Sequence, residues 1–176
     1  MRRVLVMALM TAGLALAGAE AKERPRNPQI DYAGFAALTA DTAAYREARR
    51  VPLAEFQRMA GAQGTMILDA RSADAFRAGH IAGAVNLPFT DFTDESLARV
   101  IGRDRNRRIL IYCNNNFAND VAPVAVKSVR LALNIPTFIN LVGYGYPNVY
   151  ELADIVDFND PAVRWVRSQK TSLYFR

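Results

Sequence analysis

Short apolar runs alternate along this chain with segments in which apolar residues recur every three or four positions. The runs predict buried parallel strands at 65–68, 84–87, 109–112 and 137–141. The helical spacing predicts helices at 52–60, 73–77, 96–101, 120–133 and 149–156. In the fourth of these, Pro123 is tolerated because it falls in the first turn. Strands and helices that alternate in this way predict an α/β fold with a parallel sheet and right-handed crossovers.

The beginning of the chain has the three-part pattern of a secretory signal peptide. Arg2 and Arg3 precede an apolar run at 4–17, and small-x-small sites follow it up to Ala21. The run is too short for a membrane anchor, because spanning a bilayer takes about 20 apolar residues. We therefore expect a cleaved signal at 1–21, a periplasmic or secreted protein and no stable membrane insertion. A lipoprotein is excluded because the only cysteine is Cys113.

Residues 22–50 are predicted to form a tether followed by a short helical extension. The segment 22–28 is polar and holds two prolines, and 31–50 is rich in alanine with apolar positions at loose helical spacing. One or two helices are expected there. Three roles are open for this extension: to cover the sheet edge, to cover a pocket or to bind a partner. Residues 51–176 are predicted to form the main domain with a C-terminal tail, in which Trp165 is expected to be a packing anchor.

Composition excludes several classes of protein and of site. The chain has 176 residues, a net charge of +5, 51% hydrophobic residues and 22% charged residues, which excludes a largely disordered chain. A single cysteine excludes intramolecular disulfides and cysteine-cluster zinc sites, and a single histidine excludes multi-histidine metal sites. No metal or organic cofactor is implied. The basic cluster at 103–108 has no interleaved aromatic residues, which favours a solvated turn over a nucleic-acid site.

Cys113 is the candidate for chemistry because it directly follows the clearest predicted strand, at 109–112. Ligands bind beyond the carboxyl ends of strands in open α/β sheets. The polar loop at 114–119 is expected to lead into the helix at 120–133, whose first backbone N–H groups favour an anion. A thiolate in that place is expected to have a lowered pKa and to act as a nucleophile. The alternative is an inert structural cysteine, since free cysteines are among the most buried residues.

Three strings of residues resemble a known family. They are Asp69-Ala70-Arg71, then Gly79-His80-Ile81-Ala82-Gly83-Ala84-Val85-Asn86-Leu87-Pro88, and later Ile109-Leu110-Ile111-Tyr112-Cys113. They are similar to the rhodanese signature, which is D-x-R, then G-H-I-x-G-A-x-N-x-P, then an active-site strand ending in cysteine. The resemblance covers 51–157, and it is to exported, single-domain bacterial members of the family with an N-terminal extension and a C-N-N-N-F loop.

This resemblance implies a five-stranded parallel sheet flanked by helices, and sulfurtransferase chemistry. Cys113 would take sulfur from a small donor such as thiosulfate and carry it as a persulfide until a thiol or cyanide accepts it. Substrate binding is implied for the loop residues Asn114, Asn115, Asn116, Phe117, Ala118 and Asn119, with backbone N–H groups of 114–118 holding the sulfur. Structural roles are implied for Asp69, Arg71, Gly79, His80, Gly83, Asn86 and Pro88.

The sequence departs from the family pattern in two places. The loop at 114–119 has no positive charge and no glycine, where active members usually have Arg, Lys or Gly, and this predicts weaker thiosulfate binding. The segment 143–148 replaces the usual G-G-x-x-x-W element after the last strand, which is expected to reshape the pocket rim. These departures keep a second function open, a rhodanese-fold binding module with weak catalysis. A phosphatase or arsenate reductase is rejected, because such loops normally recruit an arginine.

Overall fold

The computed structural model describes residues 27–167. The chain divides into two units, Met1–Asp31 and Tyr32–Arg176. In the first unit the backbone N–H of Ile30 donates to the carbonyl of Asn27. The expected signal peptide at 1–21 and most of the expected tether lie outside the described residues. Within 27–167, every helix is too short or too polar to cross a membrane.

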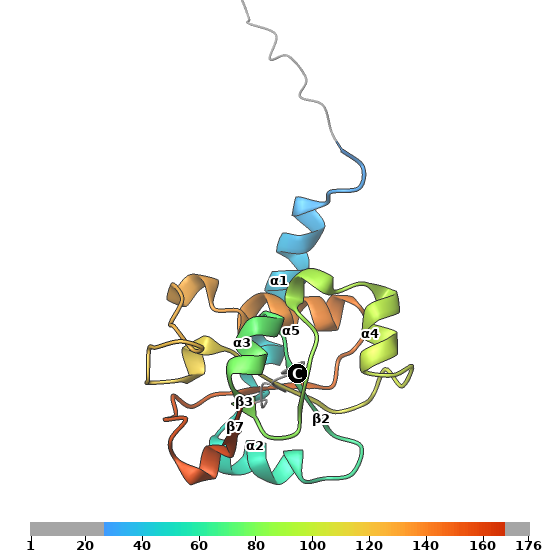
Figure 1. Cartoon of the computed structure of the whole chain (residues 1–176). Helices are drawn as coiled ribbons and strands as arrows, with labels where there is room; N and C mark the ends of the chain where they lie inside the picture. The colour runs from blue at the N-terminus through green and yellow to red at the C-terminus, as the bar shows by residue number, and fades with distance from the viewer. Residues whose placement is uncertain (1–26, 168–176) are drawn as a thin grey trace, which may run out of the picture. The chain divides into compact units, whose positions relative to one another are not determined.

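The second unit is built on a parallel sheet of five strands in the order β1-β6-β5-β2-β4 (Figure 1). The strands are β1 Arg50–Val51, β2 Met66–Asp69, β4 Ala84–Asn86, β5 Ile109–Tyr112 and β6 Val149–Leu152. Each residue of β2 and β5 is buried, which suits the apolar sequence of β5 and of residues 66–68 in β2. The predicted α/β fold, a five-stranded parallel sheet flanked by helices, is confirmed.

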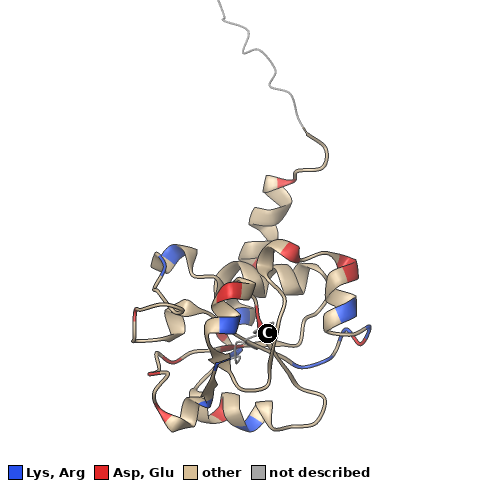
Figure 2. Cartoon of the chain, in the orientation of Figure 1, with Lys and Arg blue, Asp and Glu red and all other residues tan. Residues whose placement is uncertain are grey.

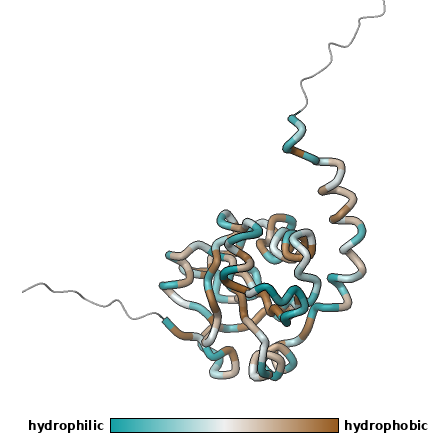
Figure 3. The backbone as a smooth tube through the Cα atoms, turned by 90° about the vertical axis from the view of Figure 1, so that its right-hand side faces the viewer, coloured by the Kyte–Doolittle hydropathy of each residue, from teal (hydrophilic) through white to brown (hydrophobic). Residues whose placement is uncertain are grey.

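Helices lie on both faces of the sheet. They are α1 Tyr32–Glu47, α2 Leu53–Ala60, α3 Ala73–Ala78, α4 Asp94–Val100 and α5 Asn134–Gly143, with 3₁₀ turns at Phe89–Asp91, Asn114–Asn116, Val129–Leu131 and Pro161–Val163. In Figure 1, α1, α4 and α5 lie above the sheet and α2 lies below it. Side chains alternate along β5, so that Ile109 and Ile111 join one hydrophobic core and Leu110 and Tyr112 the other. In Figure 3, hydrophobic stretches of the backbone, coloured brown, run through the folded body.

A small two-stranded ladder holds the end of the described chain. Strand β3, His80–Ile81, lies within the string at 79–88 and pairs antiparallel with β7, Trp165–Val166. The Trp165 ring contacts the rings of Phe117 and Phe158. A Cβ atom on Gly79 would lie 2.5 Å from that indole, so this position requires glycine. Trp165 is therefore a packing anchor.

The basic and acidic residues of the described surface are mixed. Figure 2 shows the two signs next to each other on α3 and α4, where Arg77 pairs with Asp74 and Arg99 with Glu95. In the cluster at 103–108, Arg105 donates to the carbonyl of Tyr144. This cluster belongs to the turn before β5, and its arginines help to hold the turn to the rest of the domain.

Three elements predicted after Cys113 are wrong. The segment 120–133 forms no α-helix and contains only a short 3₁₀ turn, and the next helix, α5, begins at Asn134. The strand predicted at 137–141 lies within α5. The helix predicted at 149–156 is strand β6 followed by a loop. The β-branched residues of α5 resemble a strand locally, but its apolar positions also suit a helix that packs on a sheet.

Side chains occupy the backbone groups that a helix at 120–133 would need. Asn114 Nδ2 donates to the carbonyl of Ala125, and Asn115 Nδ2 donates to the carbonyl of Lys127. The carboxylate of Asp120 accepts a hydrogen bond from the backbone N–H of Val126. Such side-chain bonds compete with helical hydrogen bonding. We call 120–133 the wall segment, because it forms one side of the cavity above Cys113.

Candidate active site

Cys113 lies at the carboxyl end of the central strand β5 and at the floor of a cavity of about 650 Å³. Only 1% of the residue is exposed. One side of the cavity comes from the beginning of α3 and the residues before it, and the other comes from the wall segment. The lining residues are Arg71, Ser72, Ala75, Cys113, Asn114, Asn115, Ala122, Pro123, Ala125, Lys127, Ser128, Leu131 and Leu133. The cavity is thus mainly apolar with a few polar groups, which is typical of a small-molecule site.

Backbone amides face the sulfur, but from a different place than the sequence predicts. The backbone N–H groups of Asn134, Asn115 and Leu133 lie close enough to the Cys113 thiol to favour its charged form and act to lower its pKa. Two of these belong to the beginning of α5, so the helix that faces the sulfur is α5. Of the N–H groups that the resemblance assigned to the sulfur, that of Asn116 faces both the side chain and the carbonyl of Cys113, whereas those of Phe117 and Ala118 donate to the carbonyls of Asn114 and Val156.

The pKa of Cys113 is raised above its ordinary value, which contradicts the predicted lowering. Burial of the thiol is the largest cause, because it penalises the charged form. The backbone amides of Asn134, Asn115 and Leu133 act in the opposite direction, while the charge of Glu151 adds to the rise. The predicted lowering rested on the helix N-terminus alone. The burial of Cys113, which the sequence does not reveal, has the larger effect on the pKa.

The four asparagines of the loop build the site rather than extend into it as free donors. Asn114 and Asn115 line the cavity and hold the wall segment through Ala125 and Lys127. Asn116 is buried and donates to the carbonyls of Leu152 and Asp154. Asn119 binds the carboxylate of Asp157. Among the residues predicted to bind substrate, the structure brings Asn114 and Asn115 to the cavity.

The remaining loop residues lead away from the cavity. Phe117 is 1% exposed and packs edge-on against the rings of Tyr112 and Trp165. Ala118 donates its N–H to Val156, and Phe117 forms a parallel bridge with the same residue. Phe117, Ala118 and Asn119 therefore fasten the loop to the segment that follows β6.

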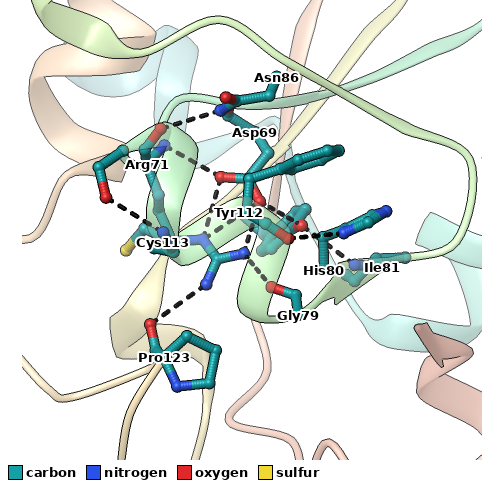
Figure 4. A network of polar contacts seen from close by, with 12 residues as sticks. Asp69, Arg71, Gly79, His80, Ile81, Asn86, Tyr112, Cys113 and Pro123 are labelled. Carbon is teal, nitrogen blue, oxygen red and sulfur yellow. Dashed lines mark hydrogen bonds and ion pairs between the residues drawn. The ribbon is translucent and has the colours of Figure 1, made fainter. Parts of the chain in front are cut away.

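A buried ion pair stands beside the cavity. Figure 4 shows the Arg71 guanidinium among Asp69, Gly79 and Pro123. Its Nη2 lies 2.6 Å from Asp69 Oδ2 and 2.7 Å from the carbonyl of Gly79, and its Nη1 lies 3.4 Å from the carbonyl of Pro123. Burial by itself would lower the pKa of Arg71, but the hydrogen bonds and charge of Asp69 outweigh it and the pKa is raised. Arg71 is thus a fixed cation that ties β2 to the wall segment.

Tyr112 completes this network from the neighbouring strand. Its hydroxyl donates to Asp69 Oδ2 at 2.6 Å and accepts from the backbone N–H of Ile81 at 3.1 Å. Burial, followed by the charge of Asp69, raises the pKa of Tyr112 well above its ordinary value. The phenol therefore stays protonated and donates to the carboxylate. The sequence gives no sign of this role, because Tyr112 resembles an ordinary core residue at the end of a strand.

The other residues with implied structural roles surround the strands. Asn86 donates to the carbonyls of Asp69 and Arg71. His80 Nδ1 lies 2.8 Å from the carbonyl of Phe76 and its ring stacks on the Phe76 ring. Gly83 has a φ of +83°, a backbone conformation that favours glycine. Pro88 precedes the 3₁₀ turn at Phe89–Asp91. None of these four lines the cavity.

The segment predicted to reshape the pocket rim lies elsewhere. Residues 143–148 connect the end of α5 to β6, so they precede the last strand of the main sheet. Tyr146 is fully buried and its hydroxyl donates to Gly102, and the Tyr144 hydroxyl donates to Phe92. Both tyrosines pack in the core on the α4 and α5 side. The prediction is wrong because it rested on the misplaced strand at 137–141.

Comparison with known families matches residues 52–154, more than half of the chain, to the rhodanese-like domain. The chain belongs to the rhodanese-like domain family. Among solved structures, it is similar to a Bacillus halodurans protein with a TM-score of 0.42 and 19% identity, covering 65% of this chain and 74% of that chain. It is also similar to the rhodanese-3-like domain of an Anabaena sp. protein with a TM-score of 0.42 and 18% identity, covering 62% and 99%. Curated proteins give no match.

In this rhodanese-like domain, the wall segment brings a cation to the cavity. Lys127 and Arg71 are the charged residues of its lining, and Arg71 is committed to Asp69. The loop at 114–119 has no cation, as the sequence shows, yet Lys127 reaches the same cavity through the hydrogen bonds of Asn115. Lys127, Ser128, Leu131 and Leu133 were missed because local sequence gives no signal that a segment so far along the chain covers Cys113.

In this rhodanese-like domain, the Cys113 thiol is expected to ionise at a higher pH than a free cysteine. Because the pKa of Cys113 is raised, the thiolate fraction at neutral pH is smaller than that of a free cysteine, whose pKa is about 8.5. The rate of alkylation of Cys113 by iodoacetamide should therefore keep rising with pH, with a midpoint above that of free cysteine. Intact mass against time at each pH measures this rate, and a midpoint below the free value would contradict the burial argument.

Proposed function

We propose that this protein is an exported sulfurtransferase or persulfide carrier that acts through Cys113. The observation that supports it best is the position of Cys113, at the floor of a cavity, at the end of the central strand and under three backbone amides. Membership of the rhodanese-like domain family supports the same class of reaction. The protein would take sulfur from a small donor and deliver it to a thiol or to cyanide, without nucleic acid or a stable membrane anchor.

The reaction would proceed in two displacements. With thiosulfate, the Cys113 thiolate attacks the outer sulfur, a bond forms between Sγ and that sulfur, and the bond between the two donor sulfurs breaks. Sulfite leaves with the electron pair of the broken bond. In the second step a thiolate or cyanide attacks the outer sulfur of the persulfide and releases Cys113 as thiolate. The amides of Asn115, Leu133 and Asn134 would stabilise the negative sulfur in both steps.

Export to the periplasm or secretion is part of the proposal. It is supported by Arg2 and Arg3, the apolar run at 4–17 and the small residues up to Ala21. An exported thiol meets oxidising conditions, which favour mixed disulfides and over-oxidation. The deep burial of Cys113 would protect it there. N-terminal sequencing of the protein recovered from the source cell tests this point, and a retained Met1 would contradict it.

The test of the proposed function is the intact mass of the reduced protein after exposure to thiosulfate. We expect a gain of one sulfur atom that cyanide or a thiol removes again. The removal distinguishes a persulfide from the addition of two oxygen atoms, which has nearly the same mass. No removable gain with thiosulfate or with an organic persulfide would contradict a sulfurtransferase.

A second function, a binding module of the rhodanese fold, has one observation in its favour. Cys113 is 1% exposed and its thiol pKa is raised, so little thiolate is present at neutral pH. A module of this kind would bind a small molecule in the apolar cavity without taking up sulfur. Binding of a donor by calorimetry together with an unchanged mass would favour it over the sulfurtransferase.

A cation added to the cavity should improve the use of thiosulfate. Ser128 lines the cavity and its side chain caps no helix, so Ser128→Arg adds charge without removing a wall contact. A charged donor binds a dianion more strongly than a neutral one, and we expect the KM for thiosulfate to fall by roughly threefold to tenfold. Steady-state kinetics measures this, with Ser128→Gln as the neutral control of similar length.

Position 128 is a better place for the added charge than position 115. Asn115→Arg would place charge nearer the cysteine, but it would remove both hydrogen bonds between Asn115 and Lys127. If Ser128→Arg and Ser128→Gln have the same KM as the unchanged protein, a further positive charge in the cavity does not strengthen thiosulfate binding.

A further inference from the structure

A buried carboxylate lies near Cys113, and the reaction proposed above does not use it. Glu151 is in β6, the strand beside β5, and is 5% exposed. Its Oε1 accepts a hydrogen bond from Asn134 Nδ2 at 3.2 Å, and the backbone N–H of the same Asn134 faces the sulfur. The negative charge of Glu151 opposes formation of a thiolate at Cys113. The site therefore needs a group that compensates for Glu151.

That group comes from the N-terminal extension. Arg46 in α1 donates from Nε to Glu151 Oε2 at 2.7 Å and from Nη2 to Oε1 at 2.6 Å. Such a two-point pair between arginine and a carboxylate fixes both charge and geometry. Arg46 precedes residue 52, where the match to the rhodanese-like domain begins. The compensating charge is thus supplied by a part of the chain outside the matched domain.

A continuous series of hydrogen bonds joins this ion pair to the reactive residue. Asn134 Nδ2 donates to Glu151 and also, at 2.9 Å, to Asn116 Oδ1. The same Asn116 oxygen accepts from the backbone N–H of Cys113 at 2.9 Å. Asn116 and Asn134 are each 5% exposed. The backbone at Cys113 is therefore linked through Asn116 and Asn134 to the Glu151 carboxylate.

We propose that Arg46 is a positioning residue for Cys113, because its ion pair with Glu151 holds Asn134 beside the sulfur and offsets part of the negative charge there. The N-terminal extension thereby completes the reactive site, although the described residues of α1 contribute nothing to the lining of the cavity. This inference rests on the proposed role of Cys113, but it concerns the ionisation of the thiol. It is therefore tested without sulfur transfer.

The other charged and titratable groups around Cys113 stay constant in the test. Arg71, from the end of β2, is paired with Asp69, and Lys127 extends from the wall segment. Tyr112, on β5, is kept protonated by its buried contact with Asp69. A change in thiol ionisation on altering Arg46 or Glu151 is therefore assigned to that pair.

The experiment measures alkylation of Cys113 by iodoacetamide across a pH series, in the full chain and in three variants. Arg46→Gln leaves Glu151 uncompensated, and we expect the rate at neutral pH to fall by roughly tenfold. Glu151→Gln keeps an oxygen that accepts from Asn134 and removes the charge, so its rate should rise by a similar factor. The double variant is neutral at both positions and should return close to the unchanged protein.

Opposite effects of the single variants separate this proposal from a merely structural role. Loosening of the fold would move all three variants in one direction, and that result would overturn the proposal. A rate for Arg46→Gln equal to that of the unchanged protein would also overturn it. The matched control is Arg58→Gln, which breaks an exposed pair with Glu55 on α2 and should leave the rate unchanged.

Arg46→Gln is expected to fold, because α1 has other contacts with the domain. The Tyr45 hydroxyl donates to the carbonyl of Pro147 at 2.8 Å, and the Tyr45 ring packs edge-on against Phe138. If this variant nevertheless does not fold, the Glu151→Gln variant tests the proposal. An alkylation rate of Glu151→Gln equal to or slower than that of the unchanged protein would overturn it. Alkylation shifts as expected without any persulfide formation would overturn the sulfurtransferase function and leave this inference intact.

Discussion

Cys113→Ser is expected to abolish sulfur transfer, with the rate falling by roughly a thousandfold or more. The serine hydroxyl is a far weaker nucleophile than a thiolate and does not form a persulfide. The fold should be retained, because serine is close in size to cysteine and its oxygen accepts hydrogen bonds from the same amides of Asn115, Leu133 and Asn134. The loss would therefore be chemical rather than structural.

Two measurements check this result together. Release of thiocyanate from thiosulfate and cyanide measures turnover, and intact mass shows whether sulfur is bound. The matched control is Ser128→Ala in the same cavity, which should keep its turnover within a few-fold. Retained turnover or a removable gain of sulfur in Cys113→Ser would exclude Cys113 as the sulfur carrier.

Arg71→Met is expected to lower the free energy of unfolding by about 3–5 kcal/mol. Methionine fills much of the space of the arginine stem, but it leaves the Asp69 carboxylate, which is 0% exposed, without its cation. The carboxylate would keep its hydrogen bonds from Tyr112 and from the backbone N–H of residue 71. These bonds do not replace the lost charge, and the carbonyls of Gly79 and Pro123 also lose a donor.

The free energies of unfolding of Arg71→Met and Arg77→Met, measured with urea, separate the loss of a buried ion pair from the loss of an exposed one. Arg77 pairs with Asp74 on the exposed side of α3, so its loss should change stability by less than about 1 kcal/mol. The double variant Asp69→Asn with Arg71→Met should be more stable than Arg71→Met alone, because no charge remains buried without a partner. Equal midpoints for the two single variants would refute the view that the buried pair stabilises the fold.

The roles of the asparagines in the loop at 114–119 could not be predicted from the sequence. The sequence identifies Cys113, and the string at 79–88 identifies the family to which the chain belongs. It assigns the asparagines to substrate, whereas in the structure Asn114 and Asn115 hold the wall segment and Asn116 holds the turn around Cys113. The hydrogen-bond partners of these amide side chains cannot be predicted from neighbouring residues, because Ala125 and Lys127 lie more than ten residues after Asn114 and Asn115.

The sequence by itself determined the α/β class, strands β2, β4 and β5, the position of Cys113 at the end of β5 and the family, because these depend on local apolar patterns and on short strings of residues. Only the tertiary structure decided that 120–133 is a cavity wall, that 134–143 is a helix and that 149–152 is a strand. It also decided that the pKa of Cys113 is raised, and it joined Arg46 to Glu151. These features depend on burial and on contacts between distant segments, and a residue acquires them only when the whole sheet is assembled.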